Sequence, residues 1–185
     1  WYPSVARTNS TGDFGFTTGP YLYYSKRGEA PVASGNYFSI WKKDKNQHFK
    51  LIFDGGVNHT RIIDGYTAAQ TKNLQVISFK QANHKKKHIP PTLTSTIETA
   101  AHLHEDIITL RSDQSILLGK KDYPRTSKEL LYQPKQSGYD LSGDMYYCVG
   151  NLYERGLEKP KGFYAQVWHY KDEWKIVADV IQLAQ

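Results

Sequence analysis

A repeated segment limits the fold of this chain more than any other feature of its sequence. The stretch "TGDFGFTTGPYLY" at residues 11–23 returns as "SGDMYYCVGNLYE" at residues 142–154, at an offset of 131 positions. Each copy places a Gly-Asp turn signal before a run of strand-forming residues. We therefore predict that the chain contains one sheet-forming unit twice.

The match continues beyond these segments and keeps its order. The offset is first 131, then 127 and finally 125. Matching pairs are Pro3 and Pro134, Gly12 and Gly143, Asp13 and Asp144, Gly19 and Gly150, Gly35 and Gly162, Tyr37 and Tyr164, Trp41 and Trp168, Lys50 and Lys175, and Asp54 and Asp179. Both changes of offset fall where turns are expected, and loops tolerate insertions. Each unit is predicted to be a meander of three or four antiparallel strands.

The second unit is preceded by segments with helical patterns. Residues 95–106 begin with the capping-box pattern Ser95-x-x-Glu98 and then repeat apolar residues at helical spacing. A short helix is also predicted in "RTSKELLYQP", residues 125–134, and a strand at residues 74–79. For "IITLRS", residues 107–112, a strand and a continued helix both remain open.

The first unit has only two residues before its matching proline, Pro3. Its sheet therefore lacks a helical cover in this chain, and an uncovered apolar face costs roughly 25 cal/mol per Å². We expect either a helical segment upstream of Trp1 in the full protein, or cover from the linker or from a second molecule.

The repeated phrase resembles the sheet half of the SnoaL-like and ketosteroid-isomerase-like proteins, which belong to the nuclear-transport-factor-two-like superfamily. In the first unit it consists of Trp1, Pro3, Ala6, Gly12, Asp13, Gly15, Phe16, Thr17, Gly19, Tyr21, Gly35, Tyr37, Ile40, Trp41 and Asp54. In the second it consists of Pro134, Gly143, Asp144, Gly150, Gly162, Tyr164, Val167, Trp168, Trp174, Lys175 and Asp179. Residues 104–131 are similar to the same superfamily's passage of helix, acidic pair, strand and helix.

This resemblance implies an α+β fold in two copies. In each copy a curved antiparallel sheet would wrap around helices, forming a cone-shaped, cystatin-like domain with a pocket at its wide end. Residues 1–59 are predicted to be the sheet half of a first cone domain. A strand and a linker follow at residues 60–92, and residues 93–185 are expected to form a second, more complete domain.

The superfamily carries out unrelated functions on one scaffold, so function has to be argued from the pocket. Its isomerase chemistry uses a carboxylate base and an oxyanion hole made by a tyrosine and a protonated carboxylic acid. The resemblance aligns Arg111 with the base and Gln166 with the neutral acid. Arginine cannot abstract a proton and glutamine cannot share one. A shifted register would bring Asp113 into play, but we assign no catalytic residue.

Candidate pocket residues come from the second unit. They are Tyr146, Cys148, Tyr164, Gln166, Trp168, Arg111 and His104. For the tryptophan, packing within the sheet is an alternative to ligand stacking. For Tyr146, Cys148, Tyr164 and Gln166 the alternative is a place in the core. His102 and His104 with their acidic neighbours do not form a metal site if helical, because residues two apart point in different directions. We expect no metal and no cofactor.

The composition limits the partners. The net charge is +6, and the densest basic cluster, "HKKKH" at residues 84–88, is interpreted as a solvated linker rather than a nucleic-acid site. The chain has no run of 18 apolar residues and only one cysteine, Cys148, so neither a transmembrane helix nor an intramolecular disulfide is expected. The sequence is neutral between a bacterial cytoplasm and a periplasm.

We therefore expect a small-molecule-binding protein without catalytic activity, whose ligand is a small hydrophobic molecule or a carboxylate. One alternative is a SnoaL-like isomerase, cyclase or hydrolase that uses the second unit's pocket. Another is an interaction module that forms a homodimer through its sheet faces.

Overall fold

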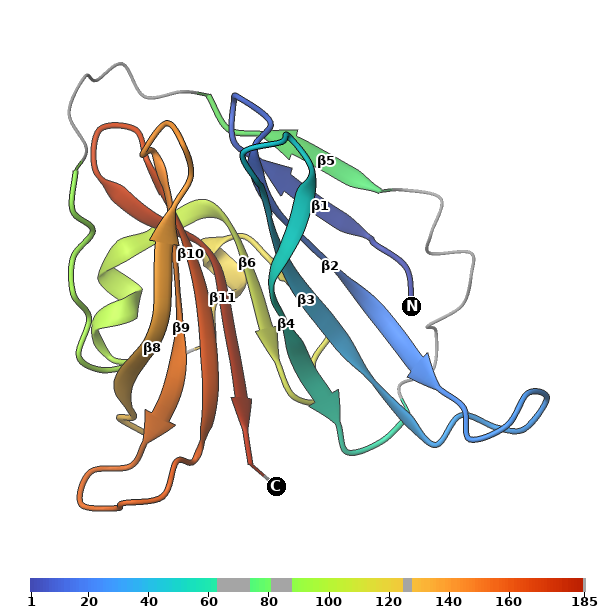
Figure 1. Ribbon diagram of the computed structural model, residues 1–185. Helices are drawn as coiled ribbons and strands as arrows, with labels where there is room; N and C mark the ends of the chain where they lie inside the picture. Colours follow the sequence, from blue (N-terminus) through green and yellow to red (C-terminus); the bar gives the residue numbers. More distant parts are fainter. Residues whose placement is uncertain (63–73, 81–87, 125–127, 185) are drawn as a thin grey trace.

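Two β-sheets face each other in this protein (Figure 1). The computed structural model describes residues 1–62, 74–80, 88–124 and 128–184. The first sheet has the order β4-β3-β2-β1-β5 and the second the order β7-β6-β11-β10-β9-β8. The first contains β1 (Val5–Thr8), β2 (Phe14–Tyr23), β3 (Ala33–Lys43), β4 (Phe49–His59) and β5 (Gln75–Ser78). The second contains β6 (Leu103–Arg111), β7 (Leu117–Leu118), β8 (Leu131–Tyr139), β9 (Met145–Tyr153), β10 (Gly162–Tyr170) and β11 (Trp174–Leu183).

The predicted duplication is visible in the strand pairing. Strands β1 to β4 and β8 to β11 follow one another as antiparallel neighbours in the same order. Thr17 pairs with Ser39 as Cys148 pairs with Gln166. Even the β-bulges match, because one lies between Ile40 and Trp41 and the other between Val167 and Trp168. The two meanders therefore share one register throughout.

Alternation along these strands builds the core. Phe14, Phe16, Phe38 and Ile40 point from the first sheet toward the second and are at most 1% exposed. Their repeat counterparts point back: Met145, Tyr147, Ala165 and Val167. The ring of Phe14 stacks on that of Tyr147 at a centroid distance of 6.2 Å. Each large buried side chain contributes about 1.5–3 kcal/mol, so this shared layer supplies much of the stability.

A polar contact between the repeats lies beside this core. Asn9 and Asp140 occupy equivalent positions, and Asn9 Nδ2 donates a hydrogen bond of 2.8 Å to Asp140 Oδ2. Each also accepts backbone N–H groups of its own turn: Asn9 Oδ1 from Asp13 at 3.1 Å and Asp140 Oδ1 from Gly143 at 2.6 Å. Direct contact between equivalent residues places this pair where the two repeats meet.

The predicted α+β class is wrong, because the described residues are mainly β-strand. Helical turns in them are limited to the 3₁₀ segments η2 (Glu98–His102) and η3 (Lys120–Asp122). The sheets therefore do not wrap around helices to form two cones. Instead, their equivalent faces cover each other.

The helix predicted at residues 95–106 is also wrong. Three of its four apolar positions do not face the protein, since Ile97 is 58% exposed and Ala100 and Ala101 are exposed too, whereas Ser95 and Thr99 are buried. Hydrogen bonding of polar side chains therefore outweighs the helical spacing. From Leu103 the chain is strand β6, which settles the open choice for residues 107–112 in favour of a strand through Arg111.

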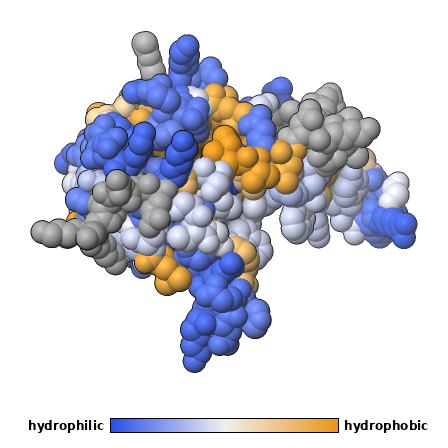
Figure 2. Space-filling model, turned by 90° about the horizontal axis from the view of Figure 1, so that it is seen from above, coloured by the Kyte–Doolittle hydropathy of each residue, from blue (hydrophilic) through white to orange (hydrophobic). Residues whose placement is uncertain are grey.

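The remaining predicted segments have mixed outcomes. The second predicted helix, residues 125–134, begins outside the described residues and is strand β8 from Leu131. The strand predicted at residues 74–79 is present as β5, which pairs in parallel with β1. Most of the basic cluster at residues 84–88 lies outside the described residues. Seen from above, a mainly hydrophilic face carries one larger patch of hydrophobic residues and smaller separate ones (Figure 2).

The contact between Asn9 and Asp140 predicts a large effect on stability. Replacing Asp140 with Ala removes the acceptor of buried turn amides, so we expect the free energy of unfolding to fall by about 2–4 kcal/mol. Urea titration measures this change. Asp172→Ala, in the exposed turn between β10 and β11, is the matched control and should change stability by about 0.5 kcal/mol or less. Equal effects of the two substitutions would contradict the assignment.

A second prediction concerns acid. Burial alone would raise the pKa of Asp13, but hydrogen bonds from Thr11, Asn9 and the Leu141 amide outweigh it, so the pKa is lowered. A lowered pKa in the folded state gives stability that is present above about pH 4 and is lost as the pH falls through the folded value. We expect the free energy of unfolding of Asp13→Asn to depend less on pH between 5 and 2 than that of the unmodified protein. Parallel slopes would refute this.

Candidate functional site

The outer face of the second sheet brings together most of the predicted pocket residues. Five of the seven line one hollow of about 170 Å³: Tyr146, Cys148, Tyr164, Gln166 and Trp168. They alternate with core residues along β9 and β10, which places them all on the face turned away from the first sheet. The segment from Ile89 to Leu93 lines the opposite side of the hollow. This face is therefore covered by irregular chain instead of the expected helix.

A buried ion pair adjoins the same face, next to Gln166. The Asp179 side chain is fully buried, and its Oδ2 accepts hydrogen bonds from Arg111 Nη2 and, at 2.8 Å, from the Tyr123 hydroxyl. Its Oδ1 accepts Gln166 Nε2 at 2.9 Å. Arg111 Nη1 in turn donates to the carbonyl oxygens of Leu110, at 2.8 Å, and Asp179, at 2.9 Å. Both charges are thus held by several fixed partners, as a buried pair requires.

The hydrogen-bond network continues from the sheet into η2, which follows the covering segment in the chain. Gln166 Nε2 also donates to the Tyr132 hydroxyl at 3.2 Å. That hydroxyl shares a hydrogen bond of 2.8 Å with Thr99 Oγ1 in η2. A continuous set of hydrogen bonds therefore joins β6, β11, β10, β8 and η2.

Burial keeps the titratable groups of this face in their neutral or paired forms. It raises the pKa values of Tyr123, Tyr132 and Tyr164, so these hydroxyls stay protonated at neutral pH. Burial alone would lower the pKa of Arg111, but the charge of Asp179 outweighs it and the pKa is raised. Burial also raises the pKa of the Cys148 thiol, whose sulfur lies 3.3 Å from the Tyr164 hydroxyl. None of these groups is poised as a nucleophile or a base.

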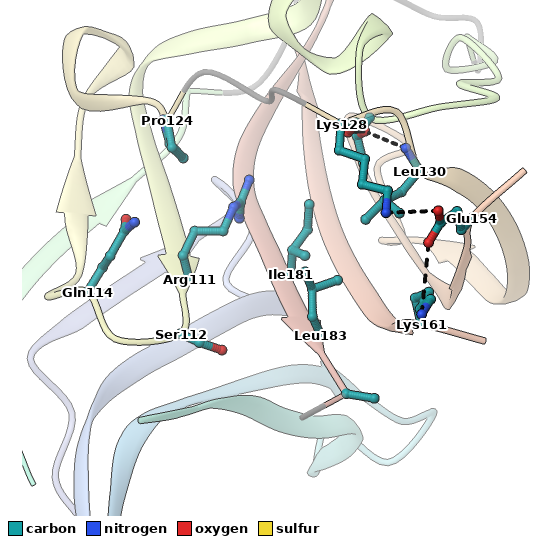
Figure 3. A pocket seen from close by; sticks show the side chains of 12 residues that line it. Arg111, Ser112, Gln114, Pro124, Lys128, Leu130, Glu154, Lys161, Ile181 and Leu183 are labelled. Atoms are coloured by element: carbon teal, nitrogen blue, oxygen red, sulfur yellow. Dashed lines mark hydrogen bonds and ion pairs between the residues drawn. The ribbon is translucent and has the colours of Figure 1, made fainter. Parts of the chain in front are cut away.

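A larger cavity of about 530 Å³ opens next to this network (Figure 3). Arg111 of β6 lies on one side of it, and a charged cluster lies on the other. Residues of strands β6 and β11 and of the connecting segments line it: Thr96, Arg111, Ser112, Gln114, Pro124, Lys128, Leu130, Glu154, Lys161, Ile181, Leu183 and Ala184. Ile181 and Leu183 of β11 lie between the two sides in Figure 3 and give the cavity an apolar wall.

The charged cluster consists of two lysines that share one carboxylate. Glu154 Oε1 lies 2.8 Å from Lys128 Nζ, and its Oε2 lies 3.9 Å from Lys161 Nζ. The lysine side chains are 62% and 48% exposed, so these pairs are solvated and contribute little to stability. Because Arg111 is already paired with Asp179, the described residues of the cavity rim keep one positive charge in excess.

The other two predicted residues have different places. Arg111 connects the buried network to the 530 Å³ cavity, since it belongs to both. His104 is not among the residues lining either cavity; its ring lies against Phe79 at a centroid distance of 5.9 Å, and its Nδ1 accepts the Asp106 amide at 3.0 Å. The structure therefore brings six of the seven candidates to one face and separates the seventh.

Sequence reasoning missed several residues of this region. Tyr123, Tyr132 and Thr99 lie in segments that were predicted as helix or left unassigned. The strand pattern of the repeat therefore could not place them beside the sheet. Nothing in the sequence distinguishes Lys128 and Lys161 from the other lysines, which are spread along the whole chain. Asp179 was detectable, because the repeat matches it with Asp54, but this match favoured a structural role.

In the described residues, no group of three or more His, Cys, Asp or Glu side chains is arranged to hold a metal ion. A search of the same residues for a helix long and apolar enough to span a membrane found none. Comparisons with protein-family models, with curated proteins and with solved structures found no match to this chain.

The environment of Cys148 predicts low reactivity. Because burial raises the pKa of the thiol, we expect Ellman's reagent at pH 8 to modify the folded protein at least about tenfold more slowly than the urea-unfolded chain. Absorbance at 412 nm follows the reaction, and Cys148→Ser provides the blank. Rapid stoichiometric modification of the folded protein would show that the thiol is activated.

Proposed function

We propose that this protein binds a small molecule without transforming it, and that the ligand is an apolar compound with an anionic group such as a carboxylate. The observation that carries the proposal is the pair Lys128 and Lys161, which share the single carboxylate of Glu154 beside the apolar wall of the 530 Å³ cavity. Cavities of about 300–1,000 Å³ with a few polar groups are typical of small-molecule sites.

The apolar part of the ligand has a defined place. Leu130 and Ile181 are 7% and 8% exposed, and Leu183 at the rim is 45% exposed. An alkyl or ring system against these side chains removes apolar surface from water, at roughly 25 cal/mol per Å². Arg111 supports the wall without offering a free charge, because Asp179, Tyr123 and two carbonyl oxygens already use its hydrogen bonds.

The anionic group then belongs at the lysines. A carboxylate beside Lys128 and Lys161 would balance the excess charge that Glu154 leaves. Binding is favoured over catalysis because Asp179 already accepts three hydrogen-bond donors and the Cys148 thiol is protonated. An acid–base or nucleophilic mechanism needs a carboxylate that is available to accept a proton, or a thiol that is deprotonated.

Matched alkyl probes test this function. Decanoate should bind in isothermal titration calorimetry more tightly than 1-decanol, which has the same chain without the charge. Lys128→Ala combined with Lys161→Ala should weaken decanoate binding about five- to tenfold and leave decanol unchanged, since each exposed charge contact is worth at most about 1 kcal/mol.

Two controls make the outcome specific. Lys26→Ala removes a lysine that also pairs with a glutamate, Glu29 at 3.8 Å, but far along the chain in the turn after β2, and should have no effect. Leu183→Trp should fill the cavity at its exposed rim and abolish binding of both probes. Equal affinity for decanoate and decanol, or no binding of either, would refute the proposal.

A further inference from the structure

The outer face of the first sheet is the repeat counterpart of the covered face just described. Ser39 pairs with Asp54 across β3 and β4, as Gln166 pairs with Asp179 across β10 and β11. The remaining counterparts are Thr17 and Cys148, Tyr37 and Tyr164, and Trp41 and Trp168. The same kinds of side chain, a tyrosine, a tryptophan and a carboxylate, thus occupy the same register on both faces.

The two faces differ in what satisfies the carboxylate. Asp179 holds the guanidinium of Arg111, which is delivered by β6, the strand paired in parallel with β11. Strand β4, the counterpart of β11, is at the edge of its sheet. Asp54 accepts one hydrogen bond, from Ser39 Oγ at 2.6 Å, and none of the described residues forms an ion pair with it. Among the residues that the structure describes, the first face therefore has the acceptor without a paired cation.

A hollow of about 520 Å³ lies over this carboxylate. Its lining is largely aromatic and includes Trp1, Tyr21, Tyr23, Tyr37 and Trp41 in addition to Asp54. The Trp1 and Tyr37 rings meet edge to face at a centroid distance of 5.2 Å. Trp41 Nε1 is already bonded to Thr17 Oγ1 at 3.2 Å, which fixes the orientation of its ring.

Aromatic faces beside a carboxylate select one class of ligand. The ring quadrupoles attract a cation, and the carboxylate adds a charge-assisted hydrogen bond. Lys43, which follows Trp41 in β3, is not the cation of this hollow, because its ammonium lies over the Phe49 ring at 5.2 Å from the centroid. We propose that this hollow binds a small organic cation in which an amidinium or guanidinium group is attached to an apolar body. On the second sheet, the guanidinium of Arg111 forms the equivalent contact with the Asp179 carboxylate.

This site is distinct from the cavity proposed above and has the opposite charge preference. Benzamidine is a suitable probe, because it joins an amidinium to a ring, and benzamide has nearly the same shape without the charge. In titrations followed by NMR, benzamidine should shift the Trp41 indole resonance and bind at least about tenfold more tightly than benzamide. Benzoate should leave that resonance unchanged.

Substitution of the carboxylate identifies the contact. Asp54→Asn retains an oxygen for the Ser39 hydroxyl but removes the charge, so benzamidine affinity should fall about three- to fivefold, because Asp54 is exposed. Glu29→Gln, an exposed carboxylate in the turn after β2, is the matched control and should have no effect. The double substitution of Lys128 and Lys161 should also have none, which keeps this test independent of the proposed function.

Three results would overturn the proposal. Benzamide and benzamidine could bind equally, Asp54→Asn could leave the affinity unchanged, or benzamidine could shift residues of the second sheet instead of Trp41. Sedimentation of the free protein adds a fourth outcome: a dimer that buries this face and excludes benzamidine would show that a second copy, and not an organic cation, occupies it.

Discussion

The packing of two equivalent apolar faces is the interaction on which the rest of this structure depends. Each meander presents an alternating strand pattern whose inner positions are mostly large and apolar, and these positions pack against the equivalent positions of its repeat. Phe14 against Tyr147 is one such contact. Because the inner faces are used within the chain, every binding surface has to be built from the two outer faces or from the loops.

The outer faces then differ by what the chain places over them. The second is covered by irregular chain that is held by hydrogen bonds, and its Asp179 carboxylate is paired with Arg111. A buried ion pair of this kind adds little net stability, but removing one partner would leave an unpaired charge. It therefore fixes the position of β6 relative to β11, and with it the wall of the 530 Å³ cavity. The first face keeps the same register of side chains and remains accessible.

Much of the sheet structure could be predicted from the sequence. The repeat fixed which strands are equivalent, and alternation along β9 and β10 was enough to group Tyr146, Cys148, Tyr164, Gln166 and Trp168, even though it could not say which face they occupy. The connecting segments could not be predicted, because their conformation is set by distant partners. Thr99 is buried by its hydrogen bond to Tyr132, 33 residues away, and this contact outweighs the helical spacing of the neighbouring alanines. Arg111 and Asp179 are separated by 68 residues, and no local pattern indicates their pairing.

The contact of Asn9 with Asp140 has a consequence for the origin of such a chain. In a dimer of two identical subunits with two-fold symmetry, equivalent residues on the axis must be the same, and two aspartates there would face each other as like charges. Covalent linkage removes that constraint, so one copy can supply an amide donor and the other a carboxylate acceptor. A single exchange between these side-chain types turns a repulsive contact into a hydrogen bond, which a fused chain can make and a dimer of identical subunits cannot.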